Sequence, residues 1–370
     1  MKIKFNTKDL KNAVNTVSKA IHGKSINFSG IFINVANGKV TITASNNEFT
    51  IIKKVDAIIF EEGLVIVNGK TFAEFIRIVT SEEIILEENA STVDEYEGKR
   101  LKITYDFFNV LYLECLPDKY STIIDNIEDF DFIMSEDLFK EVAESAMYCV
   151  SKEDSRAYLK GCFFEIIENK LVAVSLDGYR MAIVKNEIIE KLNDFKALIL
   201  GKTLDDVVNV LEKSDKLLKI KNVNNKLYLK NSDTTIILRL MELDFYDYQS
   251  IIPKETTIEI LISKEDFENC IDRVDLMCIK GYEAINIFIK DNEICVKSKN
   301  EIAEIKETVK CEKTGEDIEI SFNCKYIKEA LEKCKEKEIK ISIISNIKPV
   351  TITPVVGDKF KHIILPVRLK

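Results

Sequence analysis

A threefold repeat of predicted helices restricts the fold of this chain more than any other feature. Helix-like segments begin at Thr7, Ser135 and Lys264, at nearly even intervals, and Thr7 and Ser135 are their predicted N-caps. Each copy carries one amphipathic stripe, which a single serine interrupts in the middle copy. The stripes are Leu10, Val14, Val17 and Ile21; Leu138, Val142, Ser145 and Cys149; and Phe267, Ile271, Val274 and Cys278. Each third of the chain is therefore predicted to open with a helix that buries one face.

A second helix is predicted further along each third, beginning near Thr71, Thr203 and Lys325. Its apolar positions also match between the copies. They are Phe72, Phe75, Ile76 and Val79; Leu204, Val207, Val208 and Leu211; and Ile327, Ala330, Leu331 and Cys334. Six helices result, two in each third.

Alternating, β-branched stretches separate the helices, as in residues 30–45, 161–175 and 285–298. Each consists of two apolar runs around a turn that contains Asn or Asp, which predicts a β-hairpin with one buried face. The predicted unit is helix, strands, helix, strands. We therefore predict an α+β fold of three similar domains, each with two helices packed on antiparallel sheets.

Each repeat has the size of a domain and not of a solenoid unit, because 370 residues give three units of about 120. Two acidic, aromatic connectors, around Pro117 and around Pro253, indicate the boundaries. The predicted domains are residues 1–122, 128–252 and 255–370.

Composition limits the class of protein. Hydrophobic residues make up 46% of the chain and charged residues 31%, and no apolar run is long enough to span a membrane. The start of the chain lacks the apolar core of a signal peptide, so we expect a cytoplasmic protein. Nine cysteines without CxxC spacing predict reduced thiols, and neither a metal site nor a cofactor is predicted.

The formal net charge of −9, taken alone, argues against a nucleic-acid partner. Basic residues nevertheless recur on the predicted helices of all three thirds, for example Lys8, Lys202 and Lys325. They belong either to solvated helix faces or to one shared basic surface. Both interpretations stay open at this point.

The sequence offers little material for catalysis. Its two histidines, His22 and His362, lie at opposite ends, and it contains no phosphate-binding loop, dinucleotide fingerprint or nucleophile elbow. We predict a protein without a catalytic site of its own. An enzyme on an unrelated three-domain scaffold remains an alternative, which would require a cleft with perturbed titratable groups.

Four motifs in a fixed order resemble those of bacterial DNA polymerase III β subunits, the sliding clamps. Residues 155–184 resemble the central-domain signature R-x-Y-L-x-G followed by T-D-G-[HY]-R-L. FYDYQSIIP from Phe245 resembles the F-P-D-Y linker, SFNCKYIKEAL from Ser321 resembles the F-N-x-x-Y helix entry, and HIILPVRLK resembles the C-terminal P-[MV]-R-L. The resemblance spans essentially the whole chain and agrees with the independently observed repeat.

The resemblance implies a DNA clamp fold in which two chains close head to tail into a six-domain ring around duplex DNA, with no cofactor. Implied partners are duplex DNA, contacted without sequence preference, and proteins that bind through short linear peptides. These proteins are the polymerase III α subunit, the clamp loader, and repair and translesion polymerases. The implied function is to tether the replicative polymerase for processive synthesis in the bacterial cytoplasm, at the nucleoid.

The resemblance also implies a peptide-binding pocket between the middle and last domains. Carried over by position, it consists of Leu159, Leu176, Gly178, Tyr179, Arg180, Met181, Tyr246, Ile251, Ile347, Pro349, Ile363, Leu365, Pro366, Val367 and Arg368. Its aliphatic side chains would bury a Leu or Phe anchor, and its arginines would hold polar groups at the rim. The alternative is that residues 176–180 form only a hairpin turn and residues 365–369 only a closing strand.

Three positions depart from the family pattern. Leu176 stands in place of the usual Thr, Tyr246 in place of the usual Pro, and Ser250 where an Arg often follows. The first two changes make the pocket more apolar or narrower, so we expect a peptide preference that differs from the family norm. The departures would also permit a clamp-like paralogue that serves as a monomeric interaction module and does not encircle DNA.

The implied dimer contact joins the outer strand of the first domain to a helix end of the last: Phe75, Leu111, Leu113, Leu276 and Met277. Two of these, Leu111 and Leu113, alternate on one face of a predicted edge strand, which is an aggregation hazard unless it is paired. The alternative places them in the core. The implied DNA contacts are Lys24, Lys8, Lys11, Lys202, Arg273, Lys325 and Lys328.

Overall fold

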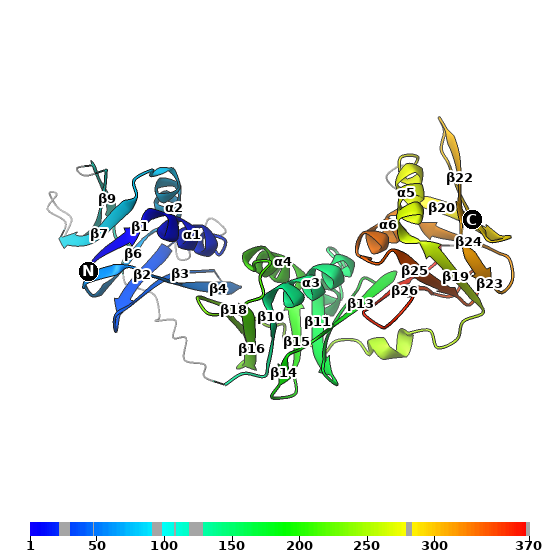
Figure 1. Ribbon diagram of the computed structural model, residues 1–370, viewed down its shortest axis with the longest axis horizontal. Coiled ribbons are helices and arrows are strands. Elements are labelled where there is room, and N and C mark those ends of the chain that lie inside the picture. Colours follow the sequence, from blue (N-terminus) through cyan, green and yellow to red (C-terminus); the bar gives the residue numbers. More distant parts are fainter. Residues whose placement is uncertain are drawn as a thin grey trace. The chain divides into compact units, whose positions relative to one another are not determined.

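The computed structural model describes residues 1–21, 30–46, 48–90, 98–106, 109–117, 129–278 and 283–367. The chain divides into two compact units (Figure 1). The first unit contains Met1–Asp137, Ile188–Asp194 and Asp205–Leu240. The second contains Leu138–Glu187, Phe195–Leu204 and Met241–Lys370. Each unit therefore combines one outer third of the chain with part of the middle third.

Six α-helices occur in the described residues, two in each third, as the repeat predicts. They are α1 (Thr7–Ser18), α2 (Gly69–Ile78), α3 (Glu136–Ala146), α4 (Gly201–Val210), α5 (Lys264–Asp275) and α6 (Cys324–Glu332). Ser135 directly precedes α3, as predicted. The prediction that Thr7 is the N-cap of α1 is wrong, because Thr7 is the first helical residue and the side chain of Asn6 accepts the capping hydrogen bond.

The first unit contains two antiparallel sheets. One has five strands in the order β5-β1-β7-β8-β9 and the other has nine in the order β14-β10-β16-β17-β18-β4-β3-β2-β6. The strands of the first are β5 (Ile58–Glu61), β1 (Lys2–Asn6), β7 (Glu83–Ala90), β8 (Lys99–Tyr105) and β9 (Asn109–Glu114). Those of the second are β14 (Glu190–Lys191), β10 (Phe132–Ser135), β16 (Leu217–Val223), β17 (Lys226–Lys230), β18 (Thr234–Arg239), β4 (Phe49–Val55), β3 (Lys39–Ser45), β2 (Gly30–Ala36) and β6 (Gly63–Asn68).

The second unit also contains two antiparallel sheets. The larger has nine strands in the order β15-β11-β12-β13-β27-β26-β25-β19-β23, and the smaller has four in the order β22-β21-β20-β24. The nine are β15 (Lys196–Leu200), β11 (Gly161–Ile167), β12 (Lys170–Leu176), β13 (Arg180–Glu187), β27 (Phe360–Ile364), β26 (Val350–Pro354), β25 (Glu338–Ile343), β19 (Ile258–Ser263) and β23 (Glu312–Thr314). The four are β22 (Glu304–Lys310), β21 (Glu293–Lys299), β20 (Ala284–Lys290) and β24 (Ile318–Asn323).

The two nine-stranded sheets have the same construction. In the first unit, a five-stranded block from the middle third joins a four-stranded block from the first third where β18 pairs with β4. In the second unit, a five-stranded block from the last third joins a four-stranded block from the middle third where β27 pairs with β13. The two remaining sheets are a single five-stranded block, which ends at β9, and a single four-stranded block, which ends at β22. By their positions in these blocks, β9 corresponds to β18 and β22 corresponds to β4, the two strands that pair with each other in the first unit.

Tight turns confirm the predicted hairpins in each third. The β2–β3 turn has positive φ at Asn37 (51°) and Gly38 (68°), and the β20–β21 turn has positive φ at Asp291 (49°) and Asn292 (61°). Asn, Asp and Gly adopt this conformation at low cost, so the turns set the register of the strands. Strands β11 and β12 form the corresponding hairpin of the middle third.

The predicted apolar stripes are largely buried. In α1 the residues Leu10, Val14 and Val17 are buried, and in α5 so are Phe267, Ile271 and Val274. The stripe predicted for α3 is shifted by about one position, because Leu138 and Ser145 are only half-buried. Its buried residues are Phe139, Val142, Ala143 and Ala146. The ring of Phe139 stacks on that of Phe164, with 5.9 Å between the centroids, so the buried face of α3 is the one that carries Phe139. No helix of the described chain is both long and apolar enough to cross a membrane.

An ion pair lies at the junction of β18 with β4. Lys53 is buried on β4, and its ammonium group donates hydrogen bonds to Asp233 Oδ1 at 2.8 Å and Thr234 Oγ1 at 2.9 Å. Removing one partner of a buried pair leaves the other charge without compensation, which costs more than the pair itself contributes.

We predict that Asp233→Asn lowers the free energy of unfolding by about 2 kcal/mol, less than for a fully buried pair because Asp233 is partly exposed. Lys53→Met, which removes the buried charge, should cost less. Exposed Lys54 provides the control Lys54→Met, for which we expect a change within about 0.5 kcal/mol. Urea unfolding measures all three variants, and an Asp233→Asn curve that coincides with the wild type would contradict the assignment.

Candidate functional site

A hydrophobic cluster lies on one face of the β12–β13–β27 part of the large sheet in the second unit. It consists of Leu159, Val172, Val174, Leu176, Met181, Ile183, Tyr248 and Ile363. Alternation along the strands places these side chains on the same face, because Leu176 pairs with Met181 and Met181 with Ile363. Four of the predicted pocket residues, Leu159, Leu176, Met181 and Ile363, are therefore brought together.

Other predicted pocket residues are exposed. The exposed side chains are Tyr179 (61%), Tyr246 (48%), Ile251 (38%) and Ile347 (57%), while Pro349, Leu365, Pro366 and Val367 are half-buried. Large apolar side chains that remain accessible on a soluble chain are typical of a surface that binds a partner. Arg368 lies outside the described residues.

The turn before β13 and the segment after β27 are tied together by backbone hydrogen bonds. The N–H of Leu365 donates to the carbonyl of Tyr179 at 2.8 Å, and the N–H of Val367 donates to the carbonyl of Ser321 at 2.8 Å. Gly178, in this turn, has φ of +92°, which disfavours any side chain there. The turn and the C-terminal segment therefore form one ordered surface.

Arg180 is more buried than the sequence suggested. Its guanidinium contacts Asp177 at 3.0 Å, Glu329, and the carbonyl of Tyr148 at 3.3 Å, and it lies over the ring of Tyr326 at 4.5 Å. With these partners, Arg180 connects the turn before β13 to α6 and positions the tyrosines around it.

Sequence reasoning missed several aromatic residues of this surface. Tyr326 on α6 stacks with Tyr179 at 6.3 Å between centroids, and Phe245 stacks on Phe163 at 5.0 Å and meets Tyr158 edge-on at 6.5 Å. The aromatic linker FYDYQ could have indicated Phe245 and Tyr248. No sequence signal places Tyr326 beside Tyr179, since the chain between them is long.

The linker is anchored by a buried hydrogen bond. Tyr248 donates its hydroxyl to Glu165 Oε1 at 2.7 Å. Burial and then this hydrogen bond raise the pKa of Tyr248 well above its usual value, so the hydroxyl remains a donor at physiological pH. Ser250, a family departure, donates to the carbonyl of Asp247 at 2.7 Å within the same linker.

A cavity of about 540 Å³ adjoins Ile183, Tyr248 and Ile252. Four lysines, Lys185, Lys254, Lys340 and Lys361, contribute to its lining. None of the predicted pocket residues that the structure describes lines it. The predicted pocket is therefore a surface distinct from this cavity, although each includes different members of the hydrophobic cluster.

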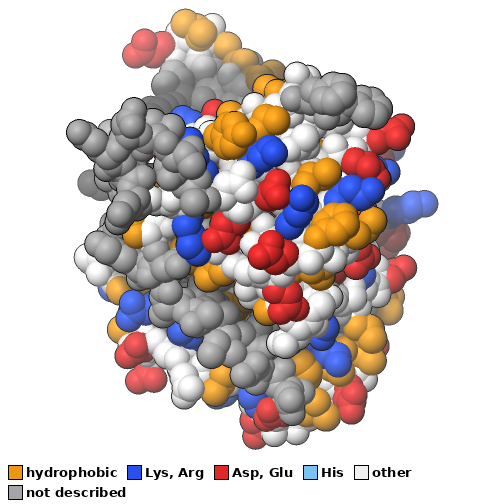
Figure 2. All heavy atoms as spheres, turned by 90° about the vertical axis from the view of Figure 1, so that its left-hand side faces the viewer, with side chains coloured by type: hydrophobic (Ala, Val, Ile, Leu, Met, Phe, Trp, Pro, Cys, Tyr) orange, Lys and Arg blue, Asp and Glu red, His pale blue; other side chains and the backbone are white. Residues whose placement is uncertain are grey.

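The predicted DNA contacts differ in how far local carboxylates neutralise them. Arg273 pairs with Glu307 at 2.8 Å, Lys325 with Glu329 at 4.0 Å, and Lys328 with Asp275 at 2.9 Å. The other three described residues, Lys8, Lys11 and Lys202, have no ion pair within the described chain. Lys24 lies outside it. On the face in Figure 2, basic and acidic side chains are interspersed.

The predicted dimer contacts are divided between the two units. Leu111 and Leu113 are half-buried on β9, at the edge of its sheet, and Phe75 of α2 meets Tyr105 edge-on at 5.2 Å. At the end of α5, Leu276 is 77% exposed and Met277 is half-buried. These residues are accessible enough to meet a partner.

Family models describe the three parts of this chain in order. They are the N-terminal, central and C-terminal domains of the DNA polymerase III beta subunit, matching residues 1–105, 133–247 and 249–368. The chain belongs to the DNA polymerase III beta subunit family. The domain limits predicted from the connectors stay predictions beside these matched ranges.

Individual relatives of the beta subunit family agree. The beta sliding clamp of Staphylococcus epidermidis is 26% identical, with 96% of each chain covered. The DNA polymerase III beta subunit of Thermotoga maritima is 25% identical, with a TM-score of 0.87 and full coverage of both chains. The DNA polymerase sliding clamp of Bacillus subtilis, at 22% identity and a TM-score of 0.92, also covers both chains fully and shares the fold. The chain thus has the three-domain clamp fold.

A buried histidine lies behind the hydrophobic cluster of the second unit. His362 points to the opposite face of β27 from Ile363, is fully buried, and its Nδ1 lies 3.0 Å from the hydroxyl of Tyr148. Burial, followed by the charge of Lys333, lowers the pKa of His362 to about 3. The folded state therefore resists protonation at this ring.

We predict that stability contributed by neutral His362 is complete above the unfolded pKa, near 6.5, and is lost as the pH falls toward about 3. In this window the unfolded chain binds one more proton than the folded chain, so the slope is at most about 1.4 kcal/mol per pH unit. His362→Gln should unfold with a shallower dependence on pH between 6.5 and 4. Parallel pH profiles for the variant and the wild type would disprove this effect.

Proposed function

We propose that the chain acts as a DNA sliding clamp, a ring of two copies that encircles duplex DNA and holds a polymerase on it. The observation that carries the proposal is the pair of incomplete sheets that end at β9 and β22. Elsewhere in the chain, the equivalent strands pair to join a five-stranded and a four-stranded block into a nine-stranded sheet. Pairing β9 of one copy with β22 of another would build the same sheet again.

The chemistry of the two edges supports this pairing. β9 presents half-buried Leu111 and Leu113 between exposed residues, and β22 presents Ile305 between exposed Glu304 and Lys306. An unpaired edge leaves backbone N–H and C=O groups without partners and invites aggregation, whereas two-fold head-to-tail closure satisfies both edges of both chains. The alternative, a monomeric interaction module, would leave both edges open.

Contact with DNA would be electrostatic and independent of sequence. Lys8 and Lys11 on α1 and Lys202 on α4 are the basic residues that we propose meet phosphates, since the three lie on helices and lack local ion pairs among the described residues. Because a closed ring retains DNA by topology, a few phosphate contacts suffice even with a net charge of −9. Such weak contacts also allow sliding.

The aromatic and aliphatic surface around Leu176 and Met181 would receive short peptides of partner proteins. The buried cluster supplies an apolar floor, and exposed Tyr179, Tyr246 and Ile347 would close over an anchor residue. We propose as partners the polymerase III α subunit, the clamp loader, and repair and translesion polymerases. In this proposal the chain itself carries no catalytic role and works in the bacterial cytoplasm.

Retention on circular DNA tests the ring. With a clamp loader and ATP, we expect the protein to remain on a nicked circular plasmid during gel filtration and to run off after the plasmid is cut once. Leu276→Asp should weaken dimerisation by about 100-fold, because a buried contact would acquire an unpaired charge, and should abolish retention. Leu217→Asp, at an exposed Leu of β16, is the control. Equal retention on circular and linear DNA would rule out a topological clamp.

Deletion of residues 367–370 tests the peptide surface. We expect this variant to lose about 100-fold in affinity for a fluorescent peptide with Leu and Phe anchors while remaining dimeric, because it removes the predicted pocket residues Val367 and Arg368 and keeps Leu365, which is bonded to Tyr179. Val356→Ser, at an exposed turn, is the control. Simultaneous loss of the dimer, measured by light scattering, would show that the segment supports ring closure instead.

A further inference from the structure

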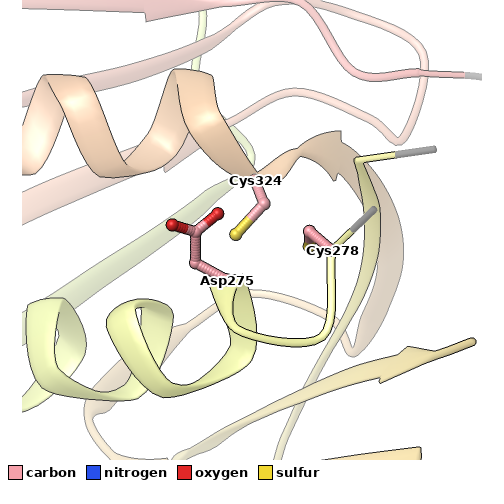
Figure 3. Close-up of side chains that lie close together, drawn as sticks. All are labelled: Asp275, Cys278 and Cys324. Atoms are coloured by element: carbon pink, nitrogen blue, oxygen red, sulfur yellow. The ribbon is translucent and has the colours of Figure 1, made fainter. Parts of the chain in front are cut away.

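Two thiols and one carboxylate converge at the end of α5. Ligand atoms of Asp275, Cys278 and Cys324 all lie within 4.8 Å of one another. Figure 3 shows the three side chains close together, between the end of α5 and the start of α6. Asp275 is the last residue of α5, Cys278 follows in the next turn, and Cys324 is the first residue of α6. Helices α5 and α6 pack against each other, so the cluster bridges two fixed elements.

Among the described residues, the hydrogen-bond partners of the two thiols, other than each other, are the side chain of Ser298 and two backbone carbonyls. Cys278 Sγ lies 3.7 Å from the carbonyl of Val274, and Cys324 Sγ lies 4.0 Å from that of Ile271. Such long sulfur contacts are readily exchanged for metal ligation. Cys324 is buried and Cys278 half-buried, so the cluster is shielded and still has an entry path.

The carboxylate is already held in place. Lys328 donates to Asp275 Oδ2 at 2.9 Å and also contacts Asp272 at 3.1 Å. This contact fixes the orientation of the Asp275 carboxylate and leaves Oδ1 without another partner in the described chain. Partners that orient a ligating carboxylate are a regular part of protein metal sites.

We propose that Asp275, Cys278 and Cys324 form a binding site for a thiophilic divalent cation such as Zn²⁺. Thiolate sulfur with one carboxylate oxygen suits Zn²⁺ in tetrahedral coordination, and water would complete the fourth position. Binding displaces the two thiol protons to solvent. The resulting two thiolates and one carboxylate are then balanced in charge by the cation together with Lys328.

The site would fix the turn that carries the proposed dimer contact. Leu276 and Met277 lie between the ligands Asp275 and Cys278 in the sequence, and the carbonyl of Met277 accepts a hydrogen bond from Asn300 Nδ2 at 3.0 Å. A cation that holds Asp275 and Cys278 against α6 would restrict the turn between them before the second copy of the chain binds. Less conformational entropy would then be lost when the ring closes. This second part rests on the proposed function.

Cobalt substitution tests the site itself. We expect Co²⁺ added to the reduced, chelator-treated full chain to give the near-ultraviolet charge-transfer band of thiolate ligation and intense visible bands of tetrahedral geometry, both abolished by Zn²⁺. Cys278→Ser and Cys324→Ser should each lower the affinity by more than about 100-fold. Cys311→Ser, at another half-buried thiol, should leave the spectrum unchanged.

Two results would overturn the site. One is the absence of a charge-transfer band in the fully reduced protein. The other is a band that persists in the Cys278→Ser, Cys324→Ser double variant, because the cation would then be bound elsewhere. Circular dichroism of the variants identifies any that fail to fold, and Asp275→Asn provides a third ligand variant that leaves both thiols in place.

The dimer dissociation constant with and without Zn²⁺ tests the second part. We expect Zn²⁺ to tighten the dimer about tenfold in the wild type and to have no effect in Cys324→Ser. An unchanged constant, when the cobalt spectrum shows the site to be filled, would overturn the link to ring closure and leave the metal site standing. A chain that binds Co²⁺ and never dimerises would instead contradict the proposed ring.

Discussion

Backbone hydrogen bonding at the edges of sheets is the constraint on which this structure depends. A strand at an edge has unpaired N–H and C=O groups, and the chain satisfies them at two places by joining blocks from different thirds, β18 with β4 and β27 with β13. Side chains reinforce one of these junctions, where Lys53 contacts Asp233 and Thr234. The equivalent strands β9 and β22 have no such partner among the described residues, and the proposed ring supplies it.

The surface proposed to bind peptides is a consequence of the second junction, between β13 and β27. Pairing of β13 with β27 places Met181 beside Ile363 and makes one apolar face from residues far apart in sequence. The same junction brings α6 near the turn before β13, where Arg180 contacts Glu329 and Tyr326. A peptide that binds there would contact two repeats at once, and its affinity would depend on the junction that holds the repeats together.

Charge on this protein is organised locally. Arg273, Lys325 and Lys328 are each paired with a carboxylate of the last third, so they contribute less to a positive surface than their number suggests. Lys328 also holds Asp275 beside two thiols, which gives that carboxylate a defined orientation. The proposed metal site thus depends on how the carboxylates of the last third are distributed.

Periodicity, turn residues and short motifs are local signals, so the six helices, the buried stripes of α1 and α5, the hairpins and the family could be read from the sequence, whereas the stripe of α3 was predicted about one position away from its buried face. The sequence motifs also placed Leu159, Leu176, Met181 and Ile363 in one predicted pocket, and the structure brings these four side chains together in the hydrophobic cluster. Tertiary structure alone decided that Tyr326 stacks on Tyr179, that Arg180 is buried in an ion-pair network, and that Cys278 meets Cys324. These contacts join residues that are distant along the chain, and their proximity depends on strand pairing and helix packing, which leave no pattern in the local sequence.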